Sequence, residues 1–238
     1  TAGEIRDCLA KGVMAAIFHI EGAEAIDENF KTLDVLYESG LRSLGPVWSR
    51  SNIFGHGVPF RFPSTGDTGD GLTAVGKNLI RFCNDRRLLI DLSHLNEKGF
   101  WDAATLSKAP LVATHSNAHA ICASSRNLSD DQLKAVRDSG GMVGLNFASG
   151  FLREDGRWST DTPLEIMVRH LDHMLKVAGE NCVALGSDFD GARIPDGIKD
   201  ATGLPNLIEA LRERQYGEQL IAKIAHENWL SVLERTWG

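Results

Sequence analysis

Four residues of types that bind divalent metals stand at the ends of short apolar segments: Glu21, His94, His115 and Asp188. Carboxylates and imidazoles are donors that zinc accepts readily. A single such residue at a strand end is more often structural or a helix cap, but four at equivalent ends of one sheet predict a metal site. A site of this kind activates water and polarises a carbonyl group at neutral pH.

Arg126 is a fifth residue that could take part in chemistry. It follows His115 by eleven positions, within the segment LVATHSNAHAICASSRNLSD. Its planar guanidinium could bind a carboxylate of the substrate through two hydrogen bonds. The side chain could equally well pair with the nearby acids Asp130 or Asp131, and the residues alone leave both interpretations open.

Short apolar segments alternate with longer amphipathic ones along the whole chain. The candidate strands are residues 13–22, 41–48, 88–94, 111–115, 141–147 and 182–191. Helical patterns cover residues 26–39, 72–86, 96–107, 129–139, 162–178 and 204–236. This alternation predicts a parallel sheet, and the nearly continuous apolar character of the strands predicts that both of their faces are buried.

Two α/β architectures compete for this pattern. A doubly wound sheet usually carries a glycine-rich loop after its first strand, and the segment IEGAEA lacks that fingerprint. A (β/α)8 barrel instead collects its catalytic groups at the carboxyl ends of several strands, which is where the four candidate ligands stand. We therefore predict a TIM-type barrel that forms a single domain over residues 1–238, with about six of the eight βα units present.

The first residues, TAGEIRDCLAKG, lack an initiator methionine and are typical of a helix already under way that ends at Gly12. We expect from this that two amino-terminal units of the barrel are absent from the chain, which would be an amino-terminally incomplete barrel.

Composition narrows the class of protein. Hydrophobic residues make up 42% of the chain, as in an ordinary globular domain, and the net charge of −7 comes without a basic stripe, which argues against a nucleic-acid partner. No apolar run is long enough to span a membrane. The four cysteines are scattered without paired spacing, so we expect reduced thiols in a cytoplasmic protein.

The segments IEGAEA, LIDLSH, ATHSNAHAICASSRN and GSDFDG resemble, in this order, the membrane (renal) dipeptidase family, the M19 metallopeptidases. The resemblance extends over nearly the whole chain. It implies a (β/α)8 barrel that holds two zinc ions and hydrolyses dipeptides, often with a D-residue at the C-terminal side.

The resemblance also implies a role for each candidate residue. Glu21 would bridge the two metals, and His94 and His115 would hold the second zinc. Asp188 would lie beside the first zinc and handle the proton of the attacking water. Arg126 would bind the terminal carboxylate of the dipeptide.

Two departures from the family pattern affect these expectations. The family's His-x-Asp pair has no counterpart upstream of Glu21, where the nearest candidate, His19, is better interpreted as a packed residue of the barrel interior. This chain alone is therefore expected to hold one zinc. Trp48 stands where better-known members carry a histidine that stabilises the tetrahedral intermediate. Its indole can wall a pocket and donate one hydrogen bond, so Trp48 and Asn52, both from GPVWSRSN, are candidate substrate-binding residues.

The remaining histidines carry weaker signals. His56 lies in the long loop 49–71, which is either a functional lid or plain surface. His170 and His173 are spaced three apart on a helical pattern, and we interpret both as helix surface. Asp190 either contacts the metal ligands without binding the metal itself or caps the loop after the last strand.

The leading hypothesis is a zinc-dependent dipeptidase with a small dipeptide as its substrate. A related metal-dependent hydrolase of another amide, ester or lactam is an alternative, because barrel chemistry varies with the loops. A catalytically inactive homologue that binds a ligand or partner is a third hypothesis. A homo-oligomer is a further expectation for the partners of this chain, since missing barrel strands would expose apolar edges.

Overall fold

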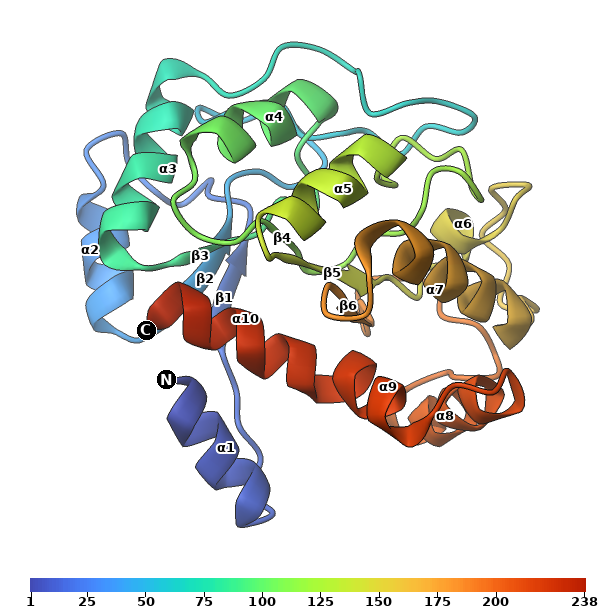
Figure 1. Ribbon diagram of the computed structural model, residues 1–238. Coiled ribbons are helices and arrows are strands. Elements are labelled where there is room, and N and C mark those ends of the chain that lie inside the picture. Colours follow the sequence, from blue (N-terminus) through green and yellow to red (C-terminus); the bar gives the residue numbers. More distant parts are fainter. The chain divides into compact units, whose positions relative to one another are not determined.

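The computed structural model describes all residues from Thr1 to Gly238 and has a mixed α/β fold (Figure 1). The chain divides into two compact units. The first comprises Thr1–Pro59, Asp67–Val112 and Trp229–Gly238, and the second comprises Phe60–Gly66 and Ala113–Asn228. Two three-stranded sheets are present, one with the order β1-β2-β3 and one with the order β4-β5-β6.

The first unit is built around the sheet β1-β2-β3. Its strands are β1 (Phe18–Glu21), β2 (Leu41–Gly45) and β3 (Leu89–Ile90), and both pairings are parallel. The register places Glu21 opposite Gly45 and Leu44 opposite Ile90. The helices are α1 (Ala2–Ala10), α2 (Lys31–Glu38), α3 (Ala74–Arg86), α4 (Glu97–Leu106) and most of α10 (Asn228–Trp237).

The second unit contains β5 and β6 and five further α-helices. The strands of its sheet are β4 (Val112–Ala113), β5 (Met142–Leu145) and β6 (Val183–Leu185), and β5 and β6 pair in parallel. The helices are α5 (Asp130–Asp138), α6 (Ser149–Leu152), α7 (Leu164–Ala178), α8 (Leu204–Glu213) and α9 (Glu218–Ala222). A 3-10 turn covers Ala201–Gly203 and a π-helical turn covers Lys223–Glu227.

Glycines let the segments of the second unit approach closely. A side chain at Gly144 or Gly186 would collide with the carbonyl oxygen of Thr114. Backbone at the end of β4 therefore packs directly against β5 and the residue that follows β6.

Side-chain caps set the starts of several helices. Thr1, Thr73, Asn96 and Ser129 each accept a hydrogen bond from the backbone N–H three residues further on. The cap at Ser129 forms a full capping box with Gln132. At the other end of α1, Gly12 adopts a φ of 64°, which confirms the predicted helix stop.

All six observed strands lie inside the predicted segments, but each strand is shorter than its segment. Segment 13–22 forms a strand only over Phe18–Glu21, and the side chains of Val13 and Met14 are 55% and 93% exposed. The prediction that both faces of every strand are buried is wrong for β1, because this edge strand pairs only with β2. The predicted α/β class is confirmed. Neither sheet closes on itself, however, so a closed barrel is not observed.

The predicted helical pattern over residues 204–236 is divided between several helices, because α8 ends at Glu213 and Gln215 adopts a positive φ of 67° before α9 begins. The short helix α6 was not predicted at all.

None of the helices combines the length and the apolar character that a bilayer crossing requires. None of the four cysteines forms a disulfide, and Cys83, Cys122 and Cys182 are buried.

Candidate metal centre and active site

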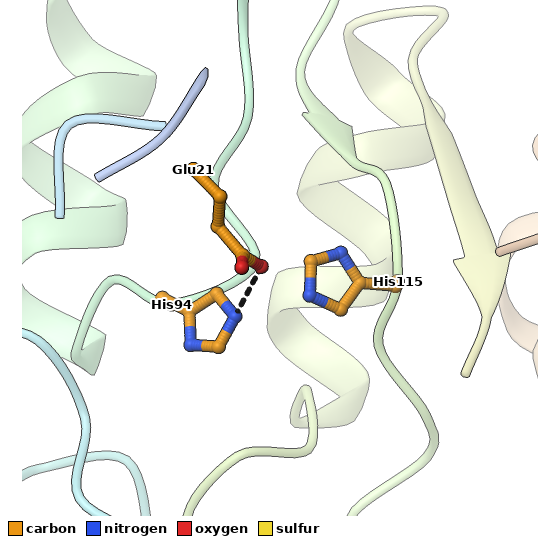
Figure 2. A group of neighbouring side chains, drawn as sticks. All are labelled: Glu21, His94 and His115. Carbon is orange, nitrogen blue, oxygen red and sulfur yellow. Dashed lines mark hydrogen bonds and ion pairs between the residues drawn. The ribbon is translucent and has the colours of Figure 1, made fainter. Parts of the chain in front are cut away.

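Glu21 and His94 face each other in the first unit. Glu21 is the last residue of β1, and His94 follows β3 by four positions. Nε2 of His94 lies 2.9 Å from Oε1 of Glu21, as the dashed line in Figure 2 shows. The imidazole is only 6% exposed, whereas the carboxylate is 40% exposed. The carboxyl ends of β1 and β3 therefore bring a carboxylate and a buried imidazole together.

The ring of His94 is held from its other nitrogen. Oγ of Ser49 lies 2.8 Å from Nδ1, so that Nε2 is the atom directed at Glu21. The indole of Trp48 packs near the same ring, with 5.9 Å between ring centroids, and is itself 37% exposed. The guanidinium of Arg50 lies 5.9 Å from the centre of the Trp48 ring. The indole of Trp48 therefore lies beside the His94 ring, where it could form one wall of a binding site.

His115, in the second unit, has a similar environment. It follows β4 by two positions, and only 9% of its surface is exposed. Oγ1 of the adjacent Thr114 lies 2.7 Å from its Nδ1. A hydroxyl at Nδ1 fixes the ring and makes Nε2 the atom suited to coordinate a metal, which is the usual way in which proteins orient histidine ligands.

The three donors drawn in Figure 2 are a carboxylate oxygen and two imidazole nitrogens. This donor set suits zinc, which accepts three protein ligands in catalytic sites and keeps one position for water or substrate. The hydroxyl contacts at Nδ1 of both rings add the supporting interactions that such ligands usually have. The residues present therefore fit a zinc ion.

Asp188 lies in the second unit, three residues beyond the end of β6. Its backbone adopts the left-handed region, with a φ of 59°, and its side chain is partly exposed. Oδ2 of Asp188 accepts a hydrogen bond of 3.0 Å from Nδ2 of Asn146. Asp190 also has a positive φ, of 65°, which places both acids in the tight turn after the strand.

Arg126 is almost completely buried, with 2% of its surface exposed. Its Nη1 donates to Oγ of Ser116 at 2.9 Å, and its Nη2 donates to the backbone oxygen of His115 at 3.0 Å. The guanidinium also lies 5.9 Å from the ring centre of Phe151. These contacts tie Arg126 to the segment that carries His115.

The acids considered as alternative partners of Arg126 are engaged with other residues. Asp131 pairs with Lys134 at 2.9 Å, and Asp130 pairs with His173 at 2.7 Å. The side chains of both pairs are partly or largely exposed, whereas the contacts of the guanidinium are buried.

Asn52, His19 and His56 have local partners within the first unit. Asn52 donates to the oxygen of Pro46, and its Oδ1 accepts from two backbone N–H groups of its own loop, so its side chain stabilises that loop. Nδ1 of His19 lies 2.9 Å from Oγ of Ser43, and 30% of its side chain is exposed, so His19 is only partly packed. Nδ1 of His56 lies 3.1 Å from Oγ of Ser51.

The prediction that His170 lies on a helix surface is wrong. Its side chain is fully buried, Nδ1 accepts from the backbone N–H of Ala118, and Nε2 donates to the oxygen of Leu152. Burial lowers the pKa of His170 to about 4. The apolar residues Met167 and Met174, three before and four after it, show that His170 lies on the buried face of α7.

Sequence reasoning missed the residues that support the ligands. Ser49, Thr114 and Asn146 each contact a candidate functional side chain, and all three are short polar residues. Only Thr114, which directly precedes His115, was adjacent to a predicted ligand. The other two come from different strand ends, so a single sequence offers little signal for them.

Comparisons with known proteins agree along the whole chain. The sequence model of a family described as membrane dipeptidase (peptidase family M19) matches residues 1–237. An uncharacterised protein encoded in the pqqA 5′ region of Klebsiella pneumoniae is 50% identical over 237 residues, which are 100% of this chain and 88% of that protein. An uncharacterised protein from the PQQ-III 3′ region of Acinetobacter calcoaceticus is 49% identical over 172 residues, 72% of this chain and 55% of that protein.

Two solved structures are also very similar to this chain. A metallo peptidase from Rhodobacter sphaeroides, liganded with a phosphinate mimic of the dipeptide L-Ala-D-Ala, is 59% identical with a TM-score of 0.99. A structure described as dipeptidase AC, a metallo peptidase of family M19, is 58% identical, also with a TM-score of 0.99. Each similarity covers 100% of this chain and 68% of the other.

Proposed function

Because this chain belongs to the membrane dipeptidase family, peptidase family M19, we propose that it hydrolyses the peptide bond of dipeptides at a zinc site. Membership of this family makes the chain a hydrolase of the metallodipeptidase class. The phosphinate mimic of L-Ala-D-Ala bound to the Rhodobacter relative supports a dipeptide substrate with a D-residue at its C-terminal side.

In this proposal Glu21, His94 and His115 would hold one zinc ion, and Asp188 would be a ligand of a second metal. The chemistry of the donors and the hydroxyl contacts of both imidazoles support the assignment. A zinc ion in such a site lowers the pKa of a water molecule and polarises the carbonyl group to be cleaved. A TIM-type barrel domain would bring these residues together, because the carboxyl ends of its strands meet at one rim.

The protein's own groups then carry out the remaining tasks. The carboxylate of Asp188 accepts a proton from the attacking water and delivers it to the leaving amine. Arg126 binds the terminal carboxylate of the dipeptide, which a planar guanidinium recognises through paired hydrogen bonds. Trp48, whose ring centre lies 5.9 Å from that of His94, would shield one side of this ligand.

The observation that carries this proposal is the contact between Glu21 and His94, with Ser49 on the other nitrogen of the ring, in a chain that matches the family over residues 1–237. The four cysteines form no disulfide, as is usual in a reducing compartment, and we also propose a cytoplasmic location.

Metal analysis of the purified protein, combined with turnover of L-Ala-D-Ala and L-Ala-L-Ala, tests the proposal. We expect bound zinc, faster turnover of the L,D-dipeptide, and loss of both zinc and turnover in His94→Gln. His226→Gln is the matched control, because His226 lies in the π-helical turn far along the chain from the candidate site. Dipeptide turnover that survives complete removal of metal would contradict the zinc mechanism, and bound zinc without turnover would favour an inactive homologue.

A further inference from the structure

Asn146 occupies a special position in the second unit. It directly follows β5, and only 1% of its surface is exposed. Nδ2 of Asn146 donates to Oδ2 of Asp188 at 3.0 Å. Burying an amide costs free energy unless each of its polar atoms has a hydrogen-bond partner.

The orientation of this amide is determined by its neighbours. Oδ1 of Asn146 accepts a hydrogen bond of 2.6 Å from the backbone N–H of Ala148, which can only donate. The opposite orientation of the amide would place two N–H groups against each other at Ala148 and two oxygens against each other at Asp188. The backbone therefore forces the N–H groups of Asn146 to point at Asp188.

A second buried amide fixes the backbone of Asn146. Oδ1 of Asn117 accepts from the N–H of Asn146 at 2.9 Å, and Nδ2 of Asn117 donates to its backbone oxygen at 3.0 Å. Asn117 is itself completely buried and follows His115 by two positions. Hydrogen bonds thus connect the segments after β4, β5 and β6 in one series, from Asn117 through Asn146 to Asp188.

This support matters because the side chain of Asp188 is partly exposed, so packing alone does not enclose it. The residue itself lies in a tight turn with a positive φ of 59°. A carboxylate that must exchange a proton with water and with a leaving amine has to be held close to one geometry.

We propose that Asn146 is a positioning residue for Asp188: its side-chain amide, held by Ala148 and Asn117, sets the direction of the carboxylate that transfers the proton. This inference rests on the role of Asp188 in the proposed function. Asn146 itself touches no substrate in this proposal and acts only through Asp188.

Asn146→Asp and Asn146→Ser test the inference in the full protein. The aspartate keeps the acceptor for Ala148 and the size of the side chain but removes the donor to Asp188, whereas the serine is neutral and too short to span both partners. For both variants we expect kcat for L-Ala-D-Ala to fall by about 10- to 100-fold, the usual effect of removing a supporting contact, with little change in KM. A crystal structure of either variant should show Asp188 turned away from its original direction, with the zinc content unchanged.

Asn127→Asp is the matched control. Asn127 is a buried amide of the same unit whose Nδ2 donates to the oxygens of Cys122 and Phe151, and it makes no hydrogen bond to Asp188. Its substitution should lower the unfolding temperature without a selective loss of kcat.

Several outcomes would overturn the inference. Wild-type kcat in Asn146→Ser, or an undisplaced Asp188 in a variant with reduced kcat, would show that Asn146 does not act by positioning this carboxylate. If only Asn146→Asp fails to fold, the kinetics and crystal structure of Asn146→Ser decide. A wild-type protein that cleaves no dipeptide would instead refute the proposed function, which is a separate result.

Discussion

Oγ of Ser49 lies 2.8 Å from Nδ1 of His94, while Nε2 of the same ring lies 2.9 Å from the carboxylate of Glu21. The imidazole is therefore held between a hydroxyl on one side and an acid on the other. Thr114 has the same relation to Nδ1 of His115, at 2.7 Å. Both candidate ligands thus present Nε2 for coordination, and the hydroxyls that hold them come from the loop after β2 and from the residue beyond β4.

Ser49→Ala should weaken zinc binding because it removes the group that orients His94. Loss of such a contact typically costs about 10- to 100-fold in metal affinity. Competition with a chromophoric chelator measures the affinity directly. Ser51→Ala is the control, since its hydroxyl contacts His56 instead and should leave zinc affinity unchanged. Equal affinities in the wild type and Ser49→Ala would show that the hydroxyl does not support the ligand.

Arg126→Lys should reduce dipeptide turnover, because an ammonium group cannot reproduce the planar pair of donors. We expect a loss of about 1.5–3 kcal/mol in transition-state binding, the scale of a hydrogen bond to a charged group, measured from kcat/KM. Full activity in the lysine variant would rule out the proposed binding of the substrate carboxylate.

Because Arg126 is buried and donates to Ser116 and to the backbone of His115, its replacement also affects the protein itself. A dipeptide amide, which lacks the terminal carboxylate, separates the two effects. The difference between wild type and variant should shrink for the amide substrate if Arg126 recognises the carboxylate. A difference of the same size for both substrates would indicate a structural role only.

The 238-residue chain should by itself bind at most one zinc ion tightly. Glu21, His94 and His115 supply three ligands for one metal, whereas a second metal would have only Glu21 and Asp188. Since affinity depends on a complete ligand set, the second position should be much weaker. Mass spectrometry under native conditions counts the ions. Two tightly bound ions without further polypeptide would mean that another residue, such as His19 or His56, completes the second site.

His170 should make the stability of the protein dependent on pH. Burial lowers its pKa from 6.5 to about 4, so between these values the unfolded chain binds more protons than the folded one. The free energy of unfolding contributed by this group is fully present above about pH 6.5 and is lost as the pH falls towards 4. The total loss should be a few kcal/mol, because a pKa difference of one corresponds to about 1.4 kcal/mol.

Urea unfolding at several pH values measures this dependence. His170→Gln should be less stable at neutral pH, because it disturbs the contacts with Ala118 and Leu152, but its stability should vary less between pH 6.5 and 4. His173→Gln, on the same helix but only half-buried, should keep the wild-type dependence. An unchanged pH dependence in His170→Gln would show that other groups cause the acid sensitivity.

The sequence alone located the strands well. Apolar segments separated by amphipathic ones predicted all six strands, because burial against covering helices requires apolar residues in short runs. The same runs marked Glu21 and His94 as strand-end residues, and these two side chains do meet. Polarity and spacing are properties of residues that are close in sequence, so a single sequence is enough to recognise them.

The lengths of the strands and the environment of single residues depended on tertiary structure. Segment 13–22 looked like a buried strand throughout, but an edge strand with one neighbour leaves residues such as Met14 exposed. His170 looked like surface because a histidine is usually polar and hydrated, yet the backbone groups of Ala118 and Leu152, from distant parts of the chain, satisfy both of its nitrogens in the interior.

The contacts that refine the site were likewise decided only in three dimensions. Asn146 is 42 residues from Asp188, and Ser49 is 45 residues from His94. Hydrogen bonds form over about 3 Å and need a defined angle, so they arise only after the strands have brought their ends together. Sequence therefore determined which residues could bind a metal and where along the chain they stand, whereas the tertiary structure decided which polar neighbours hold those residues in place.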